Sequence, residues 1–205
     1  CGGKGTRFRP ITYEIPKALI PVQGKPIVSH IMDLLKRHRI SDVYLSVGYL
    51  KEKIKEQYSD GMREGLNIKY IEENDALGTS GCLKLVEKDL GKAFIVSNGD
   101  ELKDIDIDKM YELHKEKNAL ITIALTTVSD PCSYGVAKLD GSRIIEFVEK
   151  PEKGKAPSNL INAGFYIIDP SVIKMIPRGA SMFEKDVFPK IAKTGRLYGY
   201  AFSGQ

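Results

Sequence analysis

The hydrophobic and polar residues of this chain alternate with two different periods along its first two thirds. The stretch "KPIVSHIMDLLKRHRI" has the spacing of three and four residues that marks one face of a helix. The residues on this face are Ile27, Ile31, Leu34, Leu35 and His38. Similar stretches predict helices over 51–58, 81–90 and 106–118. Runs rich in β-branched and aromatic residues predict strands over 42–49, 67–72, 93–100 and 119–128. This alternation predicts a mostly parallel, doubly wound sheet with helices on both faces.

The strand predicted at 93–100, "AFIVSNGD", is a continuous apolar run that ends in a polar loop. Such a run is typical of a strand that is buried on both faces. In doubly wound sheets, ligands bind beyond the carboxyl ends of the strands. The loops that follow strands are therefore the places to look for functional residues.

After Val128 the pattern changes to that of hairpins. Asp140-Gly141 separates two apolar runs within 134–151, which predicts a β-hairpin with a tight turn. Strands are predicted at 159–170 and 196–202. The stretch between them, 181–195, predicts a helix that starts with Ser181 and Glu184 in capping-box spacing, is interrupted near Pro189 and ends at Gly195. The expected fold is α/β, Rossmann-like and doubly wound, with a mixed, mostly parallel sheet, antiparallel hairpin additions and three α/β/α layers.

Composition narrows the class of protein. The chain has 205 residues, 42% of them hydrophobic, and no apolar run near the roughly 20 residues that span a bilayer. Three widely spaced cysteines form no CxxC pair and indicate reduced thiols in a cytoplasmic protein. The net charge of +4 is mild and spread out, which disfavours nucleic acid and membrane as partners. A small anionic substrate fits this balance.

The opening stretch "CGGKGTRFRP" has the residues of an anion-binding loop. Gly2, Gly3 and Gly5 allow successive N–H groups to converge on an anion, and Arg7 adds a planar, permanently charged fork. A glycine-rich turn beside a surface arginine explains the same residues equally well. The stretch is not a P-loop, because Lys4 precedes the last glycine instead of following it. This spacing disfavours a P-loop kinase or ATPase.

Four charged side chains are further candidates. Lys17 lies between two prolines in "EIPKALIPV", which predicts a stiff, extended segment. Asp100 follows a predicted strand, as a carboxylate that shares Mg²⁺ with substrate phosphates would. Glu149 and Lys150 end another strand at a proline, where a carboxylate could accept sugar hydroxyls and an ammonium could meet a phosphate. Taken alone, Lys17 is also explained as an ordinary surface lysine and Asp100 as a turn aspartate. Glu149 and Lys150 are also explained as a solvated charge pair.

Other kinds of active site find no support. The three histidines, His30, His38 and His114, are too scattered to indicate a metal cluster, and a GxSxG nucleophile motif is missing from the sequence.

Taken together, the motifs resemble one family over almost the whole chain. They are "GGKGTRFRPIT", "PKALIPVQGKPI", "LGTSG", "NGD", "YGV", "FVEKP", "NAGFY" and "EKDVFPKIA", in the order and rough spacing of the sugar-1-phosphate nucleotidyltransferases. The "LGTSG" motif and the tail from Ser181 are similar to the mannose-1-phosphate guanylyltransferase (GDP-mannose pyrophosphorylase) branch. The resemblance implies attack of a sugar-1-phosphate on the α-phosphate of a nucleoside triphosphate, giving a nucleotide sugar and pyrophosphate, with GTP and mannose-1-phosphate as the leading pair.

The resemblance also implies roles for individual residues. Those that would contact the nucleotide are Gly2, Gly3, Gly5, Thr6, Gly78 and Thr79. The implied catalytic residues are Arg7 on the β- and γ-phosphates, Lys17 on the α-phosphate and Asp100 on Mg²⁺. Contacts to the sugar would come from Gly135, Glu149, Asn162 and Gly164, with Lys150 on the sugar's phosphate.

The two ends depart from the family's pattern. Members begin with a short apolar strand before the glycine loop and continue into a segment like W-x-D-I-G-T-P, whose aspartate is the second metal carboxylate. This chain starts at the loop and stops at Gln205. We therefore expect 1–205 to be a single nucleotidyltransferase domain that lacks its first strand and its C-terminal end.

Two alternatives stay open within this family. The substrates could be glucose-1-phosphate with UTP or dTTP, because one sequence does not locate the polar contacts that separate the bases. The second alternative is a non-catalytic sensing or assembly module of the same fold. The presence of all the charged site residues favours the enzyme over this alternative. The oligomeric state, including a homo-oligomer, is likewise open.

Overall fold

The computed structural model describes residues 1–73 and 75–203, and these form two compact units. Unit 1 comprises Cys1–Leu77 and Asn98–Asp104. Unit 2 comprises Gly78–Ser97 and the described residues from Ile105 onward. Among the described residues, no helix is both long and apolar enough to cross a bilayer.

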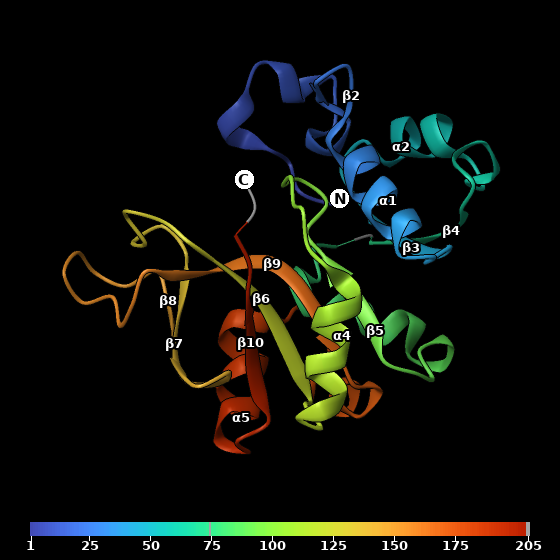
Figure 1. Ribbon diagram of the computed structural model, residues 1–205. Coiled ribbons are helices and arrows are strands. Elements are labelled where there is room, and N and C mark those ends of the chain that lie inside the picture. Colours follow the sequence, from blue (N-terminus) through green and yellow to red (C-terminus); the bar gives the residue numbers. More distant parts are fainter. Residues whose placement is uncertain (74, 204–205) are drawn as a thin grey trace. The chain divides into compact units, whose positions relative to one another are not determined.

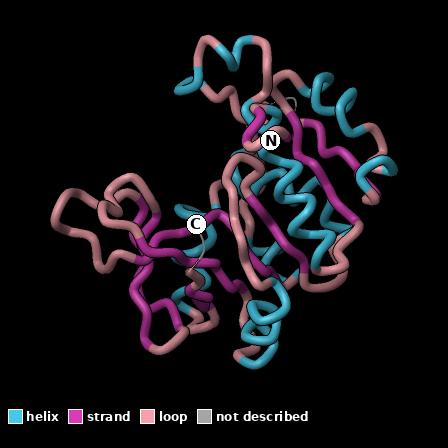
Figure 2. The backbone as a smooth tube through the Cα atoms, turned by 45° about the horizontal axis from the view of Figure 1, so that its top comes forward, coloured by secondary structure: helices cyan, strands magenta, loops and turns pink. Residues whose placement is uncertain are grey.

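Unit 1 is built on a parallel strand pair. Strands β3 (Asp42–Val47) and β4 (Asn67–Glu72) run side by side in register from end to end (Figure 2). Two helices accompany them, α1 (Ile27–Arg37) and α2 (Lys51–Tyr58), and a short hairpin consists of β1 (Pro21–Val22) and β2 (Lys25–Pro26). The helix bounds match the apolar spacing, because the buried positions on α1 are Val28, Ile31, Met32, Leu34 and Leu35.

The opening segment of unit 1 consists of short 3-10 turns. They cover Thr6–Phe8, Ile11–Tyr13 and Lys17–Leu19. Lys17 therefore begins a turn, and the expected extended conformation at this residue is wrong. Pro16 precedes the turn and is itself extended, so the proline stiffens the residue before the lysine and not the lysine itself.

Unit 2 contains a six-stranded mixed sheet in the order β5-β9-β6-β10-β8-β7. The strands are β5 (Phe94–Ser97), β6 (Ile121–Thr127), β7 (Gly135–Asp140), β8 (Arg143–Glu149), β9 (Leu160–Ile168) and β10 (Leu197–Ala201). The α/β class and the mixed sheet are confirmed. The expected majority of parallel pairs is wrong for this sheet, since among the described pairings only β6 and β10 are parallel. The physical reason is that β9 lies antiparallel between β5 and β6, and the tight hairpin β7–β8 can only pair antiparallel.

Helices cover both faces of this sheet. Successive residues of a strand point to opposite faces, and in β6 the side chains of Ile121, Ile123 and Leu125 join the core that contains helix α5 (Phe188–Lys193). On the other face, the hydroxyl of Thr122 lies 2.9 Å from Nδ1 of His114 on helix α4 (Ile107–Glu116). Figure 1 shows α4 lying across the sheet. The predicted α/β/α layering therefore holds within unit 2.

Two predicted elements of unit 2 differ from the expectation. Strand β5 is only half-buried and pairs with β9 alone among the described strands. The strands that are buried on both faces are β6 and β9. The helix predicted at 81–90 is a short turn of α-helix, α3 (Gly78–Gly81), followed by 3-10 helix over Cys82–Asp89 with a kink at Val86. The hairpin turn is confirmed, because Asp140 pairs with Arg143 and Gly141 has a φ of +60°.

The predicted capping box at Ser181 and Glu184 does not form. The helical segment begins as a π-helical turn over Phe183–Val187 and continues as α5 from Phe188, so the break near Pro189 is confirmed. The hydroxyl of Ser181 instead hydrogen-bonds the hydroxyl of Ser80 at 2.8 Å, in the buried interior. The helical segment is capped instead by the side chain of Thr79, which accepts a hydrogen bond from the amide of Phe183.

Candidate functional site

The three glycines of the opening loop differ in how tightly their surroundings restrict a side chain. Gly5 has a φ of +56°, and a β-carbon added there would lie 2.9 Å from Cγ2 of Thr12. Its carbonyl accepts hydrogen bonds from the hydroxyl of the buried Thr12 at 2.8 Å and from the amide of Phe8 at 2.9 Å. Gly2 packs against Gly48, whose added β-carbon would lie 3.3 Å from the Gly2 carbonyl oxygen. Gly3 meets no such limit, because nothing lies within 4 Å of an added β-carbon.

The loop presents its polar groups outward. Thr6 and Arg7 are exposed and form the 3-10 turn with Phe8. The first N–H groups of such a turn have no carbonyl partner within it. The loop is thus anchored through Gly2 and Gly5 and presents exposed backbone and a guanidinium, which fits binding of an anion.

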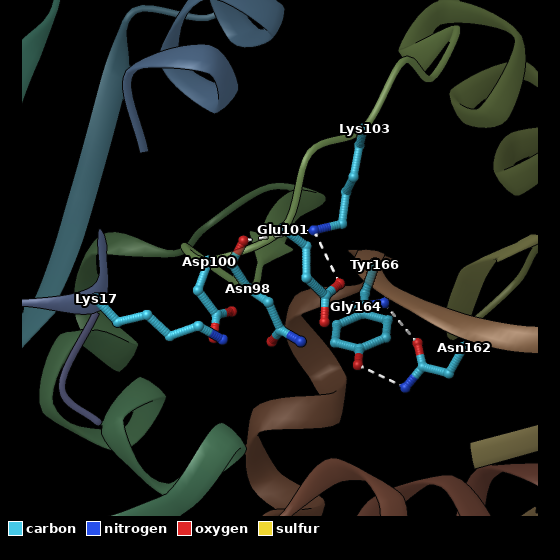
Figure 3. Close-up of polar contacts among 8 residues, drawn as sticks. All are labelled: Lys17, Asn98, Asp100, Glu101, Lys103, Asn162, Gly164 and Tyr166. Atoms are coloured by element: carbon cyan, nitrogen blue, oxygen red, sulfur yellow. Dashed lines mark hydrogen bonds and ion pairs between the residues drawn. The ribbon is translucent and has the colours of Figure 1, made fainter. Parts of the chain in front are cut away.

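Lys17 and Asp100 meet within unit 1 although 83 residues separate them. The Lys17 ammonium donates a hydrogen bond to Oδ2 of Asp100 at 2.6 Å (Figure 3). It also lies 5.1 Å from the centre of the Phe8 ring, and its β-carbon lies close to Gly5. Side-chain exposures of 22% and 37% leave both groups open to a ligand. The structure therefore joins two of the predicted catalytic residues beside the glycine loop.

Lys103 is a polar residue of the same region that sequence reasoning missed. Its side chain is only 2% exposed, and its ammonium lies 3.3 Å from a carboxylate oxygen of Glu101. It also donates a long hydrogen bond of 3.5 Å to the carbonyl of Asn98 (Figure 3). Burial lowers the pKa of Lys103, whereas the charges of Glu101 and Asp100 raise it. The loop that carries Asp100 is therefore held from inside by a buried cation.

In unit 2, Glu149 and Lys150 lie at the end of β8. Neighbouring residues of a strand point to opposite faces, but Lys150 has a φ of +49°, and this left-handed residue brings the two charges to 3.7 Å from each other. The amide of Lys150 donates to the carbonyl of Tyr134 at 2.9 Å, which fixes the bend. The two charged groups therefore lie beside each other at the end of β8.

Gly135 lies directly opposite Glu149 in the β7–β8 ladder. A β-carbon added at Gly135 would lie 2.5 Å from Cζ of Phe147 and 2.8 Å from Oε2 of Glu149. Only glycine fits there, and its absence of a side chain leaves room for the Glu149 carboxylate. Burial raises the pKa of Glu149, and the nearby charge of Glu184 raises it further, while Lys150 and Lys185 lower it.

Asn162 and Gly164 form an irregular stretch of β9. The register with β6 shifts there, because Ile123 pairs with Tyr166 and Leu125 pairs with Asn162. The strand β9 therefore advances by four residues where β6 advances by two. Asn162 spans the bulge, because its Oδ1 accepts the amide of Gly164 at 2.9 Å and its Nδ2 donates to the hydroxyl of Tyr166 at 2.8 Å (Figure 3). Gly164 has a φ of +60°. Bulges of this kind re-aim backbone groups next to functional sites.

Gly78 and Thr79 are tied to the segment that begins at Ser181. Gly78 has a φ of +74°, and a β-carbon added there would collide with the carbonyl of Ser181. Oγ1 of Thr79 accepts the amide of Phe183 at 2.9 Å, and the Thr79 hydroxyl donates to Oε2 of Glu184 at 3.1 Å. Thr79 is thus the cap that replaces the expected one.

The predicted residues divide between the two units. Unit 1 holds Gly2, Gly3, Gly5, Thr6, Arg7, Lys17 and Asp100, and unit 2 holds Gly78, Thr79, Gly135, Glu149, Lys150, Asn162 and Gly164. Glu184 and Lys103 were not predicted from the sequence as site residues. Glu184 lies in the quoted motif "EKDVFPKIA", which was the available signal, whereas nothing in the sequence marks Lys103 as buried.

Comparison with known proteins adds an independent finding. The model of the nucleotidyl transferase family matches residues 1–205. A UTP–glucose-1-phosphate uridylyltransferase of Synechocystis is 38% identical over 95% of this chain and 54% of its own length. A mannose-1-phosphate guanyltransferase of Yarrowia lipolytica is also 38% identical, over 99% of this chain and 57% of its own length. The chain therefore spans little more than half the length of these relatives.

Solved structures agree with the sequence relatives. HddC from Yersinia pseudotuberculosis, in its complex with GMP-PN, has a TM-score of 0.81 at 30% identity, covering 98% of this chain and 87% of that one. A UDP-glucose pyrophosphorylase complexed with UDP-glucose has a TM-score of 0.83 at 24% identity and shows the shared fold, covering 100% of this chain and 89% of that one. On the family model and the relatives together, this chain belongs to the nucleotidyl transferase family.

Proposed function

We propose that the chain catalyses transfer of a nucleotidyl group to a sugar-1-phosphate. A phosphate oxygen of the sugar phosphate attacks the α-phosphorus of a nucleoside triphosphate, and pyrophosphate leaves with the electron pair of the broken P–O bond. The observation that carries the proposal is the Lys17–Asp100 pair beside the glycine loop, at 2.6 Å, in a chain of this family. The substrate itself is the nucleophile, so no protein nucleophile is required.

Unit 1 supplies the groups for the triphosphate in this proposal. The N–H groups of the loop Gly2–Thr6 bind phosphate oxygens, and Arg7 neutralises the pyrophosphate that departs. Lys17 stabilises the negative charge that grows on the α-phosphate during attack. Lys103 holds the loop 98–101 in place and does not touch the substrate.

Asp100 is the residue that we propose to hold Mg²⁺. Mg²⁺ is bound through one or two carboxylates together with substrate phosphates, and a half-exposed carboxylate that follows a strand suits this donor set. The ion, when bound, neutralises phosphate charge and orients the triphosphate. Lys17 can then turn from Asp100 to the α-phosphate, because its side chain is long and only half-buried.

Unit 2 supplies the groups for the sugar phosphate in this proposal. Glu149 accepts hydrogen bonds from sugar hydroxyls, and Lys150 pairs with the sugar's phosphate. Gly135 leaves space beside Glu149, and the bulge of Asn162 and Gly164 presents backbone groups to the sugar. Gly78 and Thr79 lie against the base.

GTP and mannose-1-phosphate are the substrate pair that we propose first. The motif "LGTSG" and the tail from Ser181 support it, as do relatives named as mannose-1-phosphate guanylyltransferases in Yarrowia lipolytica and Mycobacterium tuberculosis. Glucose-1-phosphate with UTP is the second pair, because the Synechocystis relative is named for it at the same identity. The wide spacing of the three cysteines, with no CxxC pair, supports a cytoplasmic location.

The test is a matrix of nucleoside triphosphates against sugar-1-phosphates with Mg²⁺, in which release of pyrophosphate by the purified full-length protein is followed. We expect one pair to exceed the others in kcat/KM, with GTP and mannose-1-phosphate highest. If nucleotide binds but no pair releases pyrophosphate, a non-catalytic sensing or assembly role replaces the enzyme.

A further inference from the structure

Glu184 is a carboxylate of unit 2 that the proposed function leaves without a role. It lies in the π-helical turn Phe183–Val187, and its Oε2 accepts the hydroxyl of Thr79 at 3.1 Å. Thr79 in turn accepts the amide of Phe183 at 2.9 Å, so the turn and the Thr79 side chain hold each other. The buried hydrogen bond between Ser80 and Ser181 fastens the same two segments a second time. The direction of the Glu184 side chain is therefore fixed.

The π-helical turn is itself an unusual local structure. Single turns with i→i+5 hydrogen bonds are rare and are frequently found at functional sites. Here the turn leads directly into α5 at Phe188. The residue that the turn directs towards Thr79 is Glu184.

Packing places this turn beside Glu149. Phe147 and Glu149 lie two residues apart on β8 and so point to the same face of the strand. The ring of Phe147 packs edge-on against Phe188 with 5.1 Å between ring centres, and Phe188 stacks on Phe183 at 5.6 Å. The segment that carries Glu184 therefore covers the face of β8 from which Glu149 projects.

The direction of the shift in the pKa of Glu149 agrees with this packing. Glu184 raises the pKa of Glu149, against the opposing effects of Lys150 and Lys185. Among the described residues, Oε1 of Glu184 accepts no hydrogen bond, because the Thr79 hydroxyl donates to Oε2. Two ionised carboxylates on the same face of the strand can only accept hydrogen bonds, and a ligand with several hydroxyl groups supplies donors to both.

We propose that Glu184 is a specificity-determining residue for the sugar, and that its Oε1 accepts a hydroxyl next to the hydroxyl held by Glu149. The inference rests on the proposed function, because it assumes that the ligand is a pyranose phosphate. A pair of carboxylates binds two hydroxyls only when these have the right relative positions, and it therefore discriminates between sugar epimers. Thr79 is then a positioning residue that orients Glu184.

The first arm of the test measures steady-state kinetics of Glu184→Gln. The amide oxygen still accepts the Thr79 hydroxyl, so the fold is kept, but the charged acceptor for the sugar is gone. We expect KM for the sugar-1-phosphate to rise about tenfold, as for loss of one hydrogen bond to a charged group, with KM for the nucleotide within about twofold. The preference between mannose- and glucose-1-phosphate changes at the same time. Thr79→Val should raise KM for the sugar-1-phosphate by a smaller factor, and Thr79→Ser should return it to the wild-type value.

The matched control is Glu146→Gln, an exposed carboxylate on the same strand β8, which should leave both KM values unchanged. The second arm needs no catalysis: NMR of the carboxyl carbons follows the titration of Glu149, and calorimetry follows binding of mannose-1-phosphate. In Glu184→Gln the pKa of Glu149 should fall, and the sugar phosphate should bind about tenfold more weakly.

An unchanged affinity for the sugar phosphate in Glu184→Gln overturns the inference, whether or not the wild-type protein turns over. A wild-type protein that binds both substrates and releases no pyrophosphate overturns the proposed function instead. The two failures are thus distinct.

Discussion

In unit 1 the proposed catalytic groups hold one another by charge, whereas in unit 2 the proposed sugar-binding groups are held by irregular backbone. Lys17 and Asp100 meet as an ion pair on short loops. Lys150 in a left-handed conformation, the bulge at Gly164 and the π-helical turn at Glu184 place the side chains of unit 2. The contrast suits the chemistry, because charges must move during phosphoryl transfer, while recognition of hydroxyl positions needs a rigid frame.

The largest effect should follow from Lys17→Ala. Loss of one preorganised cation from the transition state costs about 2–4 kcal/mol, so kcat at saturating substrates should fall about 30- to 1,000-fold. Thermal stability should hardly change, because a half-exposed ion pair contributes only about 0–1 kcal/mol. Steady-state kinetics and calorimetry check both points, and the exposed Lys53→Ala is the control. Near-normal turnover would remove Lys17 from its proposed role.

The backbone of unit 2 should respond in the opposite way. Gly78→Ala places a β-carbon against the carbonyl of Ser181, and we expect a loss of about 2–4 kcal/mol in the free energy of unfolding. Gly154→Ala is the matched control, because Gly154 has a φ of +79° but no atom within 4 Å of an added β-carbon, and should cost only about 1 kcal/mol. Urea denaturation measures the difference. Equal losses would show that the contact with Ser181 is unimportant.

A moderate loss of stability is expected when the hydrogen bonds that span the bulge of β9 are removed. Asn162→Ala removes the hydrogen bonds to Gly164 and Tyr166 and should cost about 1–2 kcal/mol in stability, together with a higher KM for the sugar-1-phosphate. Asn162→Asp keeps the acceptor for the Gly164 amide and should recover part of both losses. If Asn162→Ala changes stability alone, Asn162 supports the fold and does not position the sugar.

The smallest effect is a shift in pH dependence. Glu149 must be ionised to act as a charged acceptor for the sugar, and its raised pKa means that binding is lost at a higher pH than for an ordinary glutamate. Glu184→Gln removes one cause of the raised pKa, so the acid limb of kcat/KM for the sugar-1-phosphate should move to lower pH. Profiles of the wild type and the variant over pH 4–8 test the direction. A shift to higher pH contradicts the carboxylate pair.

The sequence was sufficient for elements with a strong period and for charged residues in motifs. Helix α2 has the predicted bounds, and the hairpin at Gly141 follows from its turn residues. The role of Thr79 as a cap could not be predicted, because it depends on a contact between residues 104 positions apart. The sequence of β9 also did not predict whether its neighbouring strands run parallel or antiparallel to it. A continuous apolar run is compatible with either direction.

The same limit applies to the site. Lys17 and Asp100 were predicted separately, but their ion pair depends on the fold. Lys103 reads as an ordinary surface lysine, and only the structure shows that it is buried. The left-handed conformation of Lys150 is set by its hydrogen bond to Tyr134 and has no local signal in the sequence.

The central claim is direct transfer of the nucleotidyl group from the triphosphate to the sugar phosphate, without a protein-bound intermediate. A nucleoside triphosphate made chiral at the α-phosphorus with sulfur tests it. A single in-line attack predicts inversion of configuration in the nucleotide sugar, with pyrophosphate released only when the sugar-1-phosphate is present. Retention of configuration, or pyrophosphate released without the sugar phosphate, would contradict the account.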